Sequence, residues 1–176
     1  MFVTASRAWR CLPPNLFLAP SPEQCGTRLR VLSIITMSNN TRVERKLISS
    51  GSAFEREIGY SRAVVDGDWI FVSGTTGFDY RTMVIPDGLV EQTEQCLCNI
   101  QAALAQAGAS LSDAVRVVYV LPKASEFPDC WPVLRKYFGD VRPAAMMISA
   151  GLADPRMRIE IEVTARRRGD PEPSSK

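Results

Sequence analysis

One short run alternates strictly between apolar and polar side chains, and this pattern limits what the chain can form. The run extends from Ile159 to Thr164 and reads Ile-Glu-Ile-Glu-Val-Thr. In an extended strand, successive side chains point to opposite faces, so the apolar residues face one way while Glu160, Glu162 and Thr164 face the other. The sequence therefore predicts a strand with one buried face and one face that carries two carboxylates.

The residues before this strand predict another strand. Met146 to Ile148 form an apolar run, and Gly151 and the turn-prone segment Ala153-Asp154-Pro155 follow it. Short apolar runs separated by glycine, aspartate and proline are typical of strands joined by a tight connection. We expect a hairpin or a short loop between the two strands.

The rest of the chain predicts strands, a helix, a strand, a second helix and then the two strands above. Asp66-Gly67 is the strongest hairpin signal, and Gly108 and Gly139 are helix stop signals. We interpret 49–59 as a polar connection and place Trp131 on the buried side of the second helix, with Pro132 in its first turn. The predicted strands cover 43–48, 60–65, 68–73 and 114–121, and the predicted helices cover 89–107 and 126–138.

Both helices should cover the same face of this sheet, because a sheet this small cannot bury both faces with two helices. The opposite face then needs a partner. A closed ring of identical chains is the simplest solution, and its clefts between subunits would hold a ligand.

Composition favours one ordinary globular domain. The chain has 176 residues, of which 45% are hydrophobic and 23% charged, and a formal net charge of +2. This charge is too small to indicate a nucleic-acid partner, and we interpret Arg166 to Arg168 as a solvated strand end. No stretch is long and apolar enough to span a membrane, so we expect a cytoplasmic protein.

The chain ends differ from the domain between them. We expect residues 1–36 to be a disordered extension, 37–168 a single domain and 169–176 a flexible tail. The extension has two interpretations: an arginine- and serine-containing transit peptide, or a segment upstream of an ordinary start at Met37, which we prefer.

The chain contains no histidine, which excludes Ser-His-Asp and Cys-His catalysis and histidine metal sites. Any chemistry must use carboxylates, hydroxyls, thiols, backbone groups or water. Five cysteines are present, and we expect small buried side chains in a reducing compartment, with Cys130 alone to be tested as a reactive thiol. We predict no metal and no cofactor.

Several motifs stand in a characteristic order and spacing over about residues 42–167. They are Gly59-Tyr60-Ser61-Arg62-Ala63-Val64, Trp69-Ile70-Phe71-Val72-Ser73-Gly74, Gln92-Thr93, Asn99-Ile100, Arg142-Pro143-Ala144 and Ile159-Glu160-Ile161-Glu162. Taken together, they resemble the RidA family, also called the YjgF/YER057c/UK114 family. The resemblance implies a chorismate-mutase-like α+β fold, with a mixed sheet, two helices on one face and a homotrimer with ligand clefts between subunits. It also implies hydrolysis of reactive enamines or imines to keto acids and ammonia.

The same resemblance assigns roles to individual residues. Glu160 matches the glutamate that positions the attacking water, Tyr60 matches a tyrosine of the cleft, and Ser73 and Gly74 match a strand end near the ligand. A carboxylate in a partly desolvated interface has a raised pKa and can relay a proton. The alternatives are a structural glutamate that accepts backbone hydrogen bonds across the trimer, and simple turn chemistry at Ser73-Gly74.

One position departs from the pattern of the family's deaminases. Where they have an arginine that binds the substrate carboxylate, this chain has Ala145. An alanine cannot make that bidentate contact, so the resemblance is to a branch that lacks the arginine. We interpret Arg142, Arg156 and Arg158 as solvated or loop charges.

Two functions remain open. The first is a hydrolytic deaminase that acts on a small reactive metabolite, with water activated by Glu160. The second is a non-catalytic module that binds a small molecule in the same cleft. Ribonuclease activity fits poorly with the weak net charge and the absence of histidine. The expected partners are a small-molecule ligand and other copies of the chain, with no nucleic acid and no membrane.

Overall fold

The computed structural model describes residues 45–168, all of which belong to one unit, Thr41–Lys176. The predicted extension 1–36, the start of the domain at 37 and the tail 169–176 lie outside the described residues. Within 45–168, no helix combines the length and the apolar character needed to cross a membrane.

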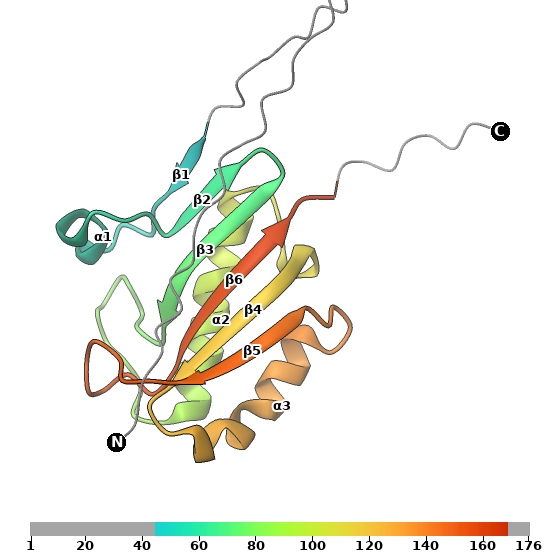
Figure 1. Ribbon diagram of the computed structural model, residues 1–176. Coiled ribbons are helices and arrows are strands. Elements are labelled where there is room, and N and C mark those ends of the chain that lie inside the picture. The colour runs from blue at the N-terminus through green and yellow to red at the C-terminus, as the bar shows by residue number, and fades with distance from the viewer. Residues whose placement is uncertain (1–44, 169–176) are drawn as a thin grey trace, which may run out of the picture. The chain divides into compact units, whose positions relative to one another are not determined.

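Alternating and β-branched runs give the strands, and periodic apolar runs give the helices (Figure 1). Within residues 45–168, the strands are β1 Lys46–Ile48, β2 Ala63–Asp66, β3 Trp69–Thr76, β4 Ala114–Leu121, β5 Ala144–Ser149 and β6 Glu160–Arg166. The helices of the same range are α1 Ala53–Ile58, α2 Leu89–Gln106 and α3 Phe127–Phe138, with 3-10 turns at Leu111–Asp113 and Ala124–Glu126.

The strands form one mixed sheet in the order β1-β2-β3-β6-β4-β5. Only β4 and β5 pair in parallel among these strands, because α3 carries the chain back to the same end of the sheet before β5 begins. The predicted α+β class with a mixed sheet is confirmed. The predicted hairpin between the last two strands is wrong: β5 is an edge strand, and residues 150–159 carry the chain to β6, which lies between β3 and β4.

The alternation in β6 has the predicted effect. Ile161 and Val163 are completely buried, whereas Glu162 on the opposite face is exposed. Val163 is paired with Val72 of β3 on one side and with Val117 of β4 on the other. These three valines are all buried, so the central strands meet the helices with a continuous apolar surface.

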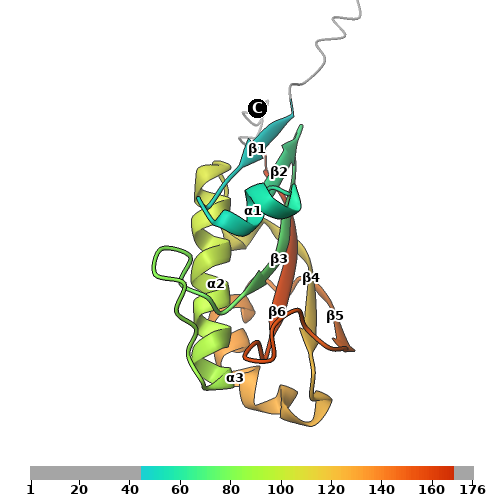
Figure 2. The same cartoon turned by 90° about the vertical axis from the view of Figure 1, so that its left-hand side faces the viewer.

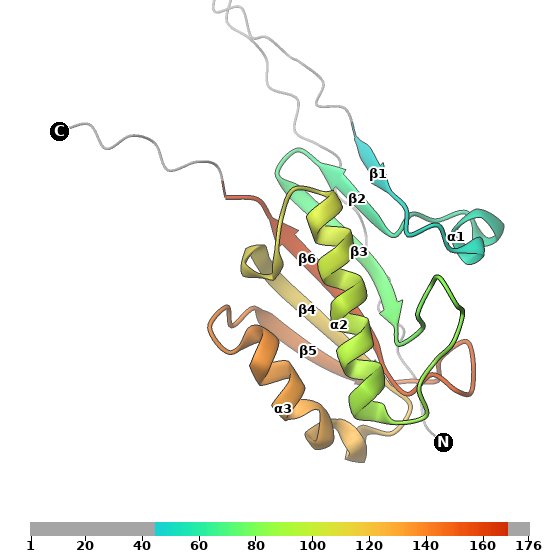
Figure 3. The ribbon, with the colours of Figure 1, turned by 180° about the vertical axis from the view of Figure 1, so that it is seen from behind.

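Helices α2 and α3 pack on the same face of the sheet, as predicted (Figure 2). Figure 3 shows α2 lying along the sheet with α3 beside it. The apolar stripe of α2 provides much of the core, through Leu89, Cys96, Leu97, Ile100, Ala103 and Leu104.

Two details of the helices correct the sequence interpretation. The segment 49–59 is not only a connection, because it contains α1, which begins after Ser52 and ends at Gly59 with φ 86°. A helix this short has too few turns to show a period. In α3, Trp131 is half exposed, and Pro132 lies inside the helix instead of in its first turn. Its ring removes only the hydrogen bond to the carbonyl of Pro128, close to the helix start.

Within residues 45–168, no helix covers the second face of the sheet. Trp69 and Phe71 of β3 stack there with ring centroids 6.5 Å apart, and Arg166 lies over the Trp69 ring. Met146 and Ile148 of β5 are also exposed. Exposed apolar patches of this kind mark interaction surfaces, so the predicted self-association has a suitable surface. The homotrimer itself stays a prediction.

Candidate functional site

A cavity of about 550 Å³ lies where the carboxyl end of β3 and the start of β6 meet α1. It brings together four of the predicted site residues, Tyr60, Ser73, Gly74 and Glu160, but not Ala145. The complete lining is Phe54, Ile58, Tyr60, Arg62, Ser73, Gly74, Thr76, Phe78, Tyr80, Ala153, Asp154, Met157 and Glu160.

Glu160 lies against the backbone of Gly74. It is the first residue of β6 and pairs with Thr76, beyond an irregularity in β3 between Val72 and Thr75. A Cβ atom at position 74 would overlap Oε1 of Glu160. The glycine is therefore needed for the close approach of the carboxylate to the strand.

The environment of Glu160 changes its acidity. Burial raises the pKa of the Glu160 carboxyl above its usual value, the charge of Arg62 lowers this pKa, and Glu162 raises it further. The net effect is a raised pKa. A carboxyl group of this kind holds and releases its proton closer to neutral pH than an exposed glutamate does.

Arg62 lies at the base of the cavity, and sequence reasoning gave it no role. Its side chain is only 2% exposed. Nη1 donates to the Gly74 carbonyl at 2.9 Å and to Oγ1 of Thr75 at 3.1 Å, and Nη2 donates to the Tyr60 hydroxyl at 2.8 Å. The guanidinium also packs 4.7 Å from the centre of the Tyr80 ring. Arg62 therefore fixes the strand end and the cavity tyrosine together.

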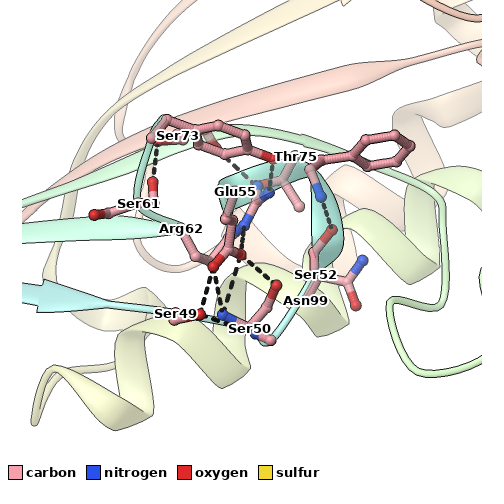
Figure 4. Close-up of polar contacts among 12 residues, drawn as sticks. Ser49, Ser50, Ser52, Glu55, Ser61, Arg62, Ser73, Thr75 and Asn99 are labelled. Carbon is pink, nitrogen blue, oxygen red and sulfur yellow. Dashed lines mark hydrogen bonds and ion pairs between the residues drawn. The ribbon is translucent and has the colours of Figure 1, made fainter. Parts of the chain in front are cut away.

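Glu55 of α1 is a second residue that sequence reasoning missed. Its Oε1 lies 3.6 Å from Nε of Arg62, and it accepts hydrogen bonds from Oγ of Ser49 at 2.5 Å and from the Ser50 backbone at 3.1 Å (Figure 4). Burial acts to raise the pKa of Glu55, but these hydrogen bonds and Arg62 lower it overall. Glu55 thus attaches α1, and with it the cavity residue Phe54, to the rest of the site.

Two sequence signals could have indicated this pair. Arg62 stands inside the motif Gly59-Tyr60-Ser61-Arg62, next to the buried residue Ala63, where a charge needs a partner. Ser52 and Glu55 have the Ser-x-x-Glu spacing that is typical of the start of a helix. The sequence does not show that these residues lie close to Arg62, because they come together only when β1 pairs with β2.

The hydroxyl of Ser73 is already used within the protein. It donates to the Ser61 carbonyl at 2.7 Å, and so joins the end of β3 to the segment before β2. Ser73 lines the cavity, but its hydroxyl proton is donated to a backbone carbonyl. The interpretation of Ser73-Gly74 as simple turn chemistry is wrong, because β3 continues through both residues to Thr76. The site role of Ser73 stays a prediction.

The loop between β5 and β6 is anchored to α2 by Gln92, a completely buried residue of the Gln92-Thr93 motif. Its Nε2 donates to the Pro86 carbonyl at 2.6 Å and to the Arg156 carbonyl at 2.8 Å, and its Oε1 accepts from the Arg158 backbone at 2.8 Å. These bonds hold in place the loop that contributes Met157 to the cavity.

Comparisons with known proteins agree with this geometry. The model of the family described as Endoribonuclease L-PSP matches residues 50–167. A crystal structure of a YjgF/YER057c/UK114 family member from Mycobacterium tuberculosis is 38% identical with a TM-score of 0.65, and it covers 70% of this chain and 100% of its own. The chain belongs to the RidA (YjgF/YER057c/UK114) family.

Two relatives that are similar in sequence carry different names. A RutC family protein of Pyrococcus abyssi is 36% identical over 107 residues, which are 60% of this chain and 84% of the relative. A protein of Capra hircus named 2-iminobutanoate/2-iminopropanoate deaminase is 30% identical over 122 residues, which are 69% of this chain and 89% of the relative. The family match includes every residue that lines the cavity.

Ala145, which we predicted to stand where the family's deaminases have an arginine, does not line the cavity of the single chain. It is in the edge strand β5, next to Val117, whose neighbour on the other side is Val163. The role assigned to Ala145 belongs to a cleft between subunits and stays a prediction.

The three arginines considered as substitutes bond to other protein groups. Arg142 donates to the Gly139 carbonyl at 3.1 Å. Arg156 pairs with Asp154 at 2.7 Å, and Arg158 pairs with Glu126 at 2.8 Å. None of the three lines the cavity. The interpretation of these residues as loop or solvated charges agrees with this geometry.

The cysteines of the described residues differ in their burial. Cys96 and Cys130 are buried, as expected, whereas Cys98 is exposed. Cys130 is completely buried, and burial raises the pKa of its thiol, which disfavours the reactive thiolate form. Its reactivity stays a question for experiment. Within residues 45–168, no group of three or more Cys, Asp or Glu side chains is arranged to hold a metal ion.

Proposed function

We propose that this protein is a hydrolytic deaminase that converts a small imine or enamine to a carbonyl compound and ammonia, with water activated by Glu160. The observation that supports this proposal best is the position of Glu160, a partly buried carboxyl with a raised pKa in a largely apolar cavity. The name of the Capra hircus relative, an imine deaminase, points to the same reaction class.

The proposed chemistry needs one group that accepts and then donates a proton. The Glu160 carboxylate takes a proton from water as the water oxygen bonds to the carbon of the protonated imine, and the C=N electron pair moves to the nitrogen, which becomes a neutral amine. Glu160 then passes this proton to the amine nitrogen. As the C–N bond breaks and ammonia leaves, the new hydroxyl group returns its proton to Glu160 and becomes the carbonyl. The ammonia takes that proton and departs as ammonium, which restores the carboxylate. A carboxyl whose pKa lies above its usual value is suited to both steps.

The cavity needs an outer wall, and we propose that a second copy of the chain supplies it. The exposed apolar residues of β3 and β5 are the surface for this contact, in a homotrimer with its clefts at the subunit boundaries. The proposal also includes a cytoplasmic location, where a reducing environment keeps Cys96 and Cys130 as thiols.

A second candidate is a module that binds a small molecule without turnover. The observation in its favour concerns Arg62, whose Nη atoms donate to Gly74, Thr75 and Tyr60 and which is not free to clamp a substrate carboxylate. This candidate predicts that ligands raise the melting temperature but that none is consumed.

Ammonia release from a panel of imines and enamines, generated in situ by an amino-acid oxidase or from amines, tests the two candidates. We expect release from at least one compound and a decrease of kcat by roughly a hundredfold to ten-thousandfold in Glu160→Gln. The rate of the unaltered protein should fall as pH drops through the raised pKa of Glu160, because the base form is needed.

The matched control is Glu57→Gln, which removes a carboxylate from an exposed position of α1 outside the cavity. It should retain the rate of the unaltered protein. Stabilisation by compounds that are never hydrolysed would favour the binding module, and equal rates for Glu160→Gln and Glu57→Gln would reject the role of Glu160.

A further inference from the structure

We infer that the cavity selects a ligand whose polar end is neutral or positively charged, on an apolar or aromatic body, and that it rejects carboxylates. This inference rests on the proposed function only in using the same cavity. Its basis is the charge balance of the groups that line the cavity, which are Arg62, Asp154 and Glu160 among the described residues.

The positive charge of Arg62 is already balanced. Glu55 lies 3.6 Å from its Nε, and both side chains are buried. Its two Nη1 hydrogens are directed to the Gly74 carbonyl and to Oγ1 of Thr75, and one Nη2 hydrogen is directed to the Tyr60 hydroxyl. Three of the five N–H donors of the guanidinium are therefore used, and Nε, one of the two that remain, faces the Glu55 carboxylate. A ligand carboxylate that reached Nε would meet this like charge.

The negative charge of Asp154 is balanced as well. Oδ2 of Asp154 accepts from Nη2 of Arg156 at 2.7 Å, and Oδ1 accepts from Nε at 3.0 Å. Hydrogen bonds from Arg156 lower the pKa of Asp154 to about 2, so this pair keeps one charge of each sign. It adds no net charge to the cavity.

Glu160 is left without a partner. Within residues 45–168, its side chain takes part in no ion pair and accepts no hydrogen bond, although it is partly buried. Arg62 is near enough to lower the pKa of Glu160, but its hydrogen bonds go to other groups. The three ionised side chains of the lining and their two partners therefore sum to one negative charge, which is located at Glu160.

This charge determines what the cavity binds at its polar end. A carboxylate placed beside Glu160 would meet a like charge in surroundings that screen it poorly, whereas a protonated imine would meet an opposite charge. A protonated imine is also the form that water attacks more readily. The same carboxylate would then attract the ligand and activate the water.

The walls of the cavity determine the body of the ligand. The lining includes aromatic and aliphatic side chains from α1, from the segment after β3 and from the loop before β6. Apolar walls of this kind favour an apolar or aromatic group over a short polar chain. They are Phe54, Ile58, Phe78, Tyr80 and Met157.

Three probes of nearly equal shape test the inference: benzamidine, benzamide and benzoate, which carry a positive, a zero and a negative charge on the same ring. Their dissociation constants are measured by isothermal titration calorimetry at pH 7.5 and low salt with the full chain. We expect benzamidine to bind roughly tenfold or more tightly than benzoate, with benzamide between them. In Glu160→Gln, the ratio between benzamidine and benzoate should fall towards one, whereas Glu57→Gln should leave it unchanged.

Benzoate binding as tightly as benzamidine, or no binding of any probe at millimolar concentration, would overturn the inference. The three probes measured on the unaltered protein are enough to decide this, so the test does not depend on the folding of any variant. A preference for benzamidine without hydrolysis of any imine would retain the inference and reject the deaminase. Hydrolysis restricted to imino acids, with benzoate bound more tightly than benzamidine, would support the deaminase and overturn the inference.

Discussion

Arg62 and Glu55 form an ion pair that is almost completely withdrawn from solvent, with Nε and Oε1 3.6 Å apart and side chains that are 2% and 6% exposed. Among the described residues, none accepts a hydrogen bond from Nε of Arg62, so the attraction of Glu55 is the main compensation for this buried group. A buried charge left alone is costly. The pair therefore couples the position of α1 to the base of the cavity.

Replacing Glu55 should be among the most harmful changes outside the core. In Glu55→Ala, the buried guanidinium of Arg62 loses its counter-ion, and three groups on Ser49 and Ser50 lose their acceptor. We expect the free energy of unfolding to fall by about 3 kcal/mol in urea titrations. The control Glu57→Ala, on the exposed side of the same helix, should change it by less than about 0.5 kcal/mol. Equal effects of the two variants would mean that the pair contributes little.

Stability should depend on pH in opposite ways at two carboxyls. The pKa of Glu55 is lowered in the folded chain, so its contribution is present above the unfolded pKa near 4.5 and is lost as pH falls through the lowered value. The pKa of Glu160 is raised, so its contribution is favourable at low pH and is lost as pH rises from 4.5 through the raised value.

Glu160→Gln isolates the second effect, because glutamine does not titrate. The melting temperature of this variant should exceed that of the unaltered protein at pH 7 to 8, and the difference should shrink as the pH approaches 4.5. Thermal scans from pH 4 to pH 8 measure this difference. A constant difference over the whole range would show that Glu160 is not held in an unfavourable ionised form.

Gly74→Ala should separate activity from stability. The added methyl group would overlap Oε1 of Glu160, but this atom is the end of a flexible side chain that can move away. We expect a loss of activity of about tenfold to a hundredfold, because the base is displaced, with a change in unfolding free energy of about 1 kcal/mol or less. Adding Glu160→Asp, which shortens the acid, should restore part of the rate. A double variant no better than the single one would contradict this explanation.

The proposed trimer should depend on the uncovered face of the sheet. Phe71→Glu places a charge in the middle of this face, and we expect the sedimentation coefficient to change from that of a trimer to that of a monomer, with an unaltered far-ultraviolet circular dichroism spectrum. The control Val90→Glu changes an exposed apolar residue of α2, with 41% exposure against 48% for Phe71. It should remain a trimer. A monomeric unaltered protein would exclude the arrangement.

Local patterns predicted the elements well where a period was long enough to see. The β4 strand has its predicted bounds, and α2 differs from its prediction by one residue. The short helix α1 was missed because its six residues are defined by a cap at Ser52 and a left-handed Gly59, not by a repeat. The place of β6 in the sheet was missed because strand pairing is set by contacts distant in sequence.

The site residues also divide into those that local motifs reveal and those that depend on contacts distant in sequence. Tyr60, Ser73, Gly74 and Glu160 were found from motifs, and they line one cavity. Arg62 stands within a motif, but the motif does not reveal its role, because this role depends on Glu55, which pairs with Arg62 only after α1 has formed. The resemblance marks Ala145 as a departure from the pattern of the family's deaminases, but the single chain does not test its role, which we assign to a cleft between subunits.

The position of β6 between β3 and β4 also affects how the molecule is made. Among the described strands, β6 is the last to leave the ribosome, and until it arrives β3 and β4 have no common neighbour to pair with. The same segment begins with Glu160. A nascent chain that stops before β6 therefore has two separate pieces of sheet and lacks Glu160, so completion of the fold and acquisition of the proposed base are a single event in synthesis.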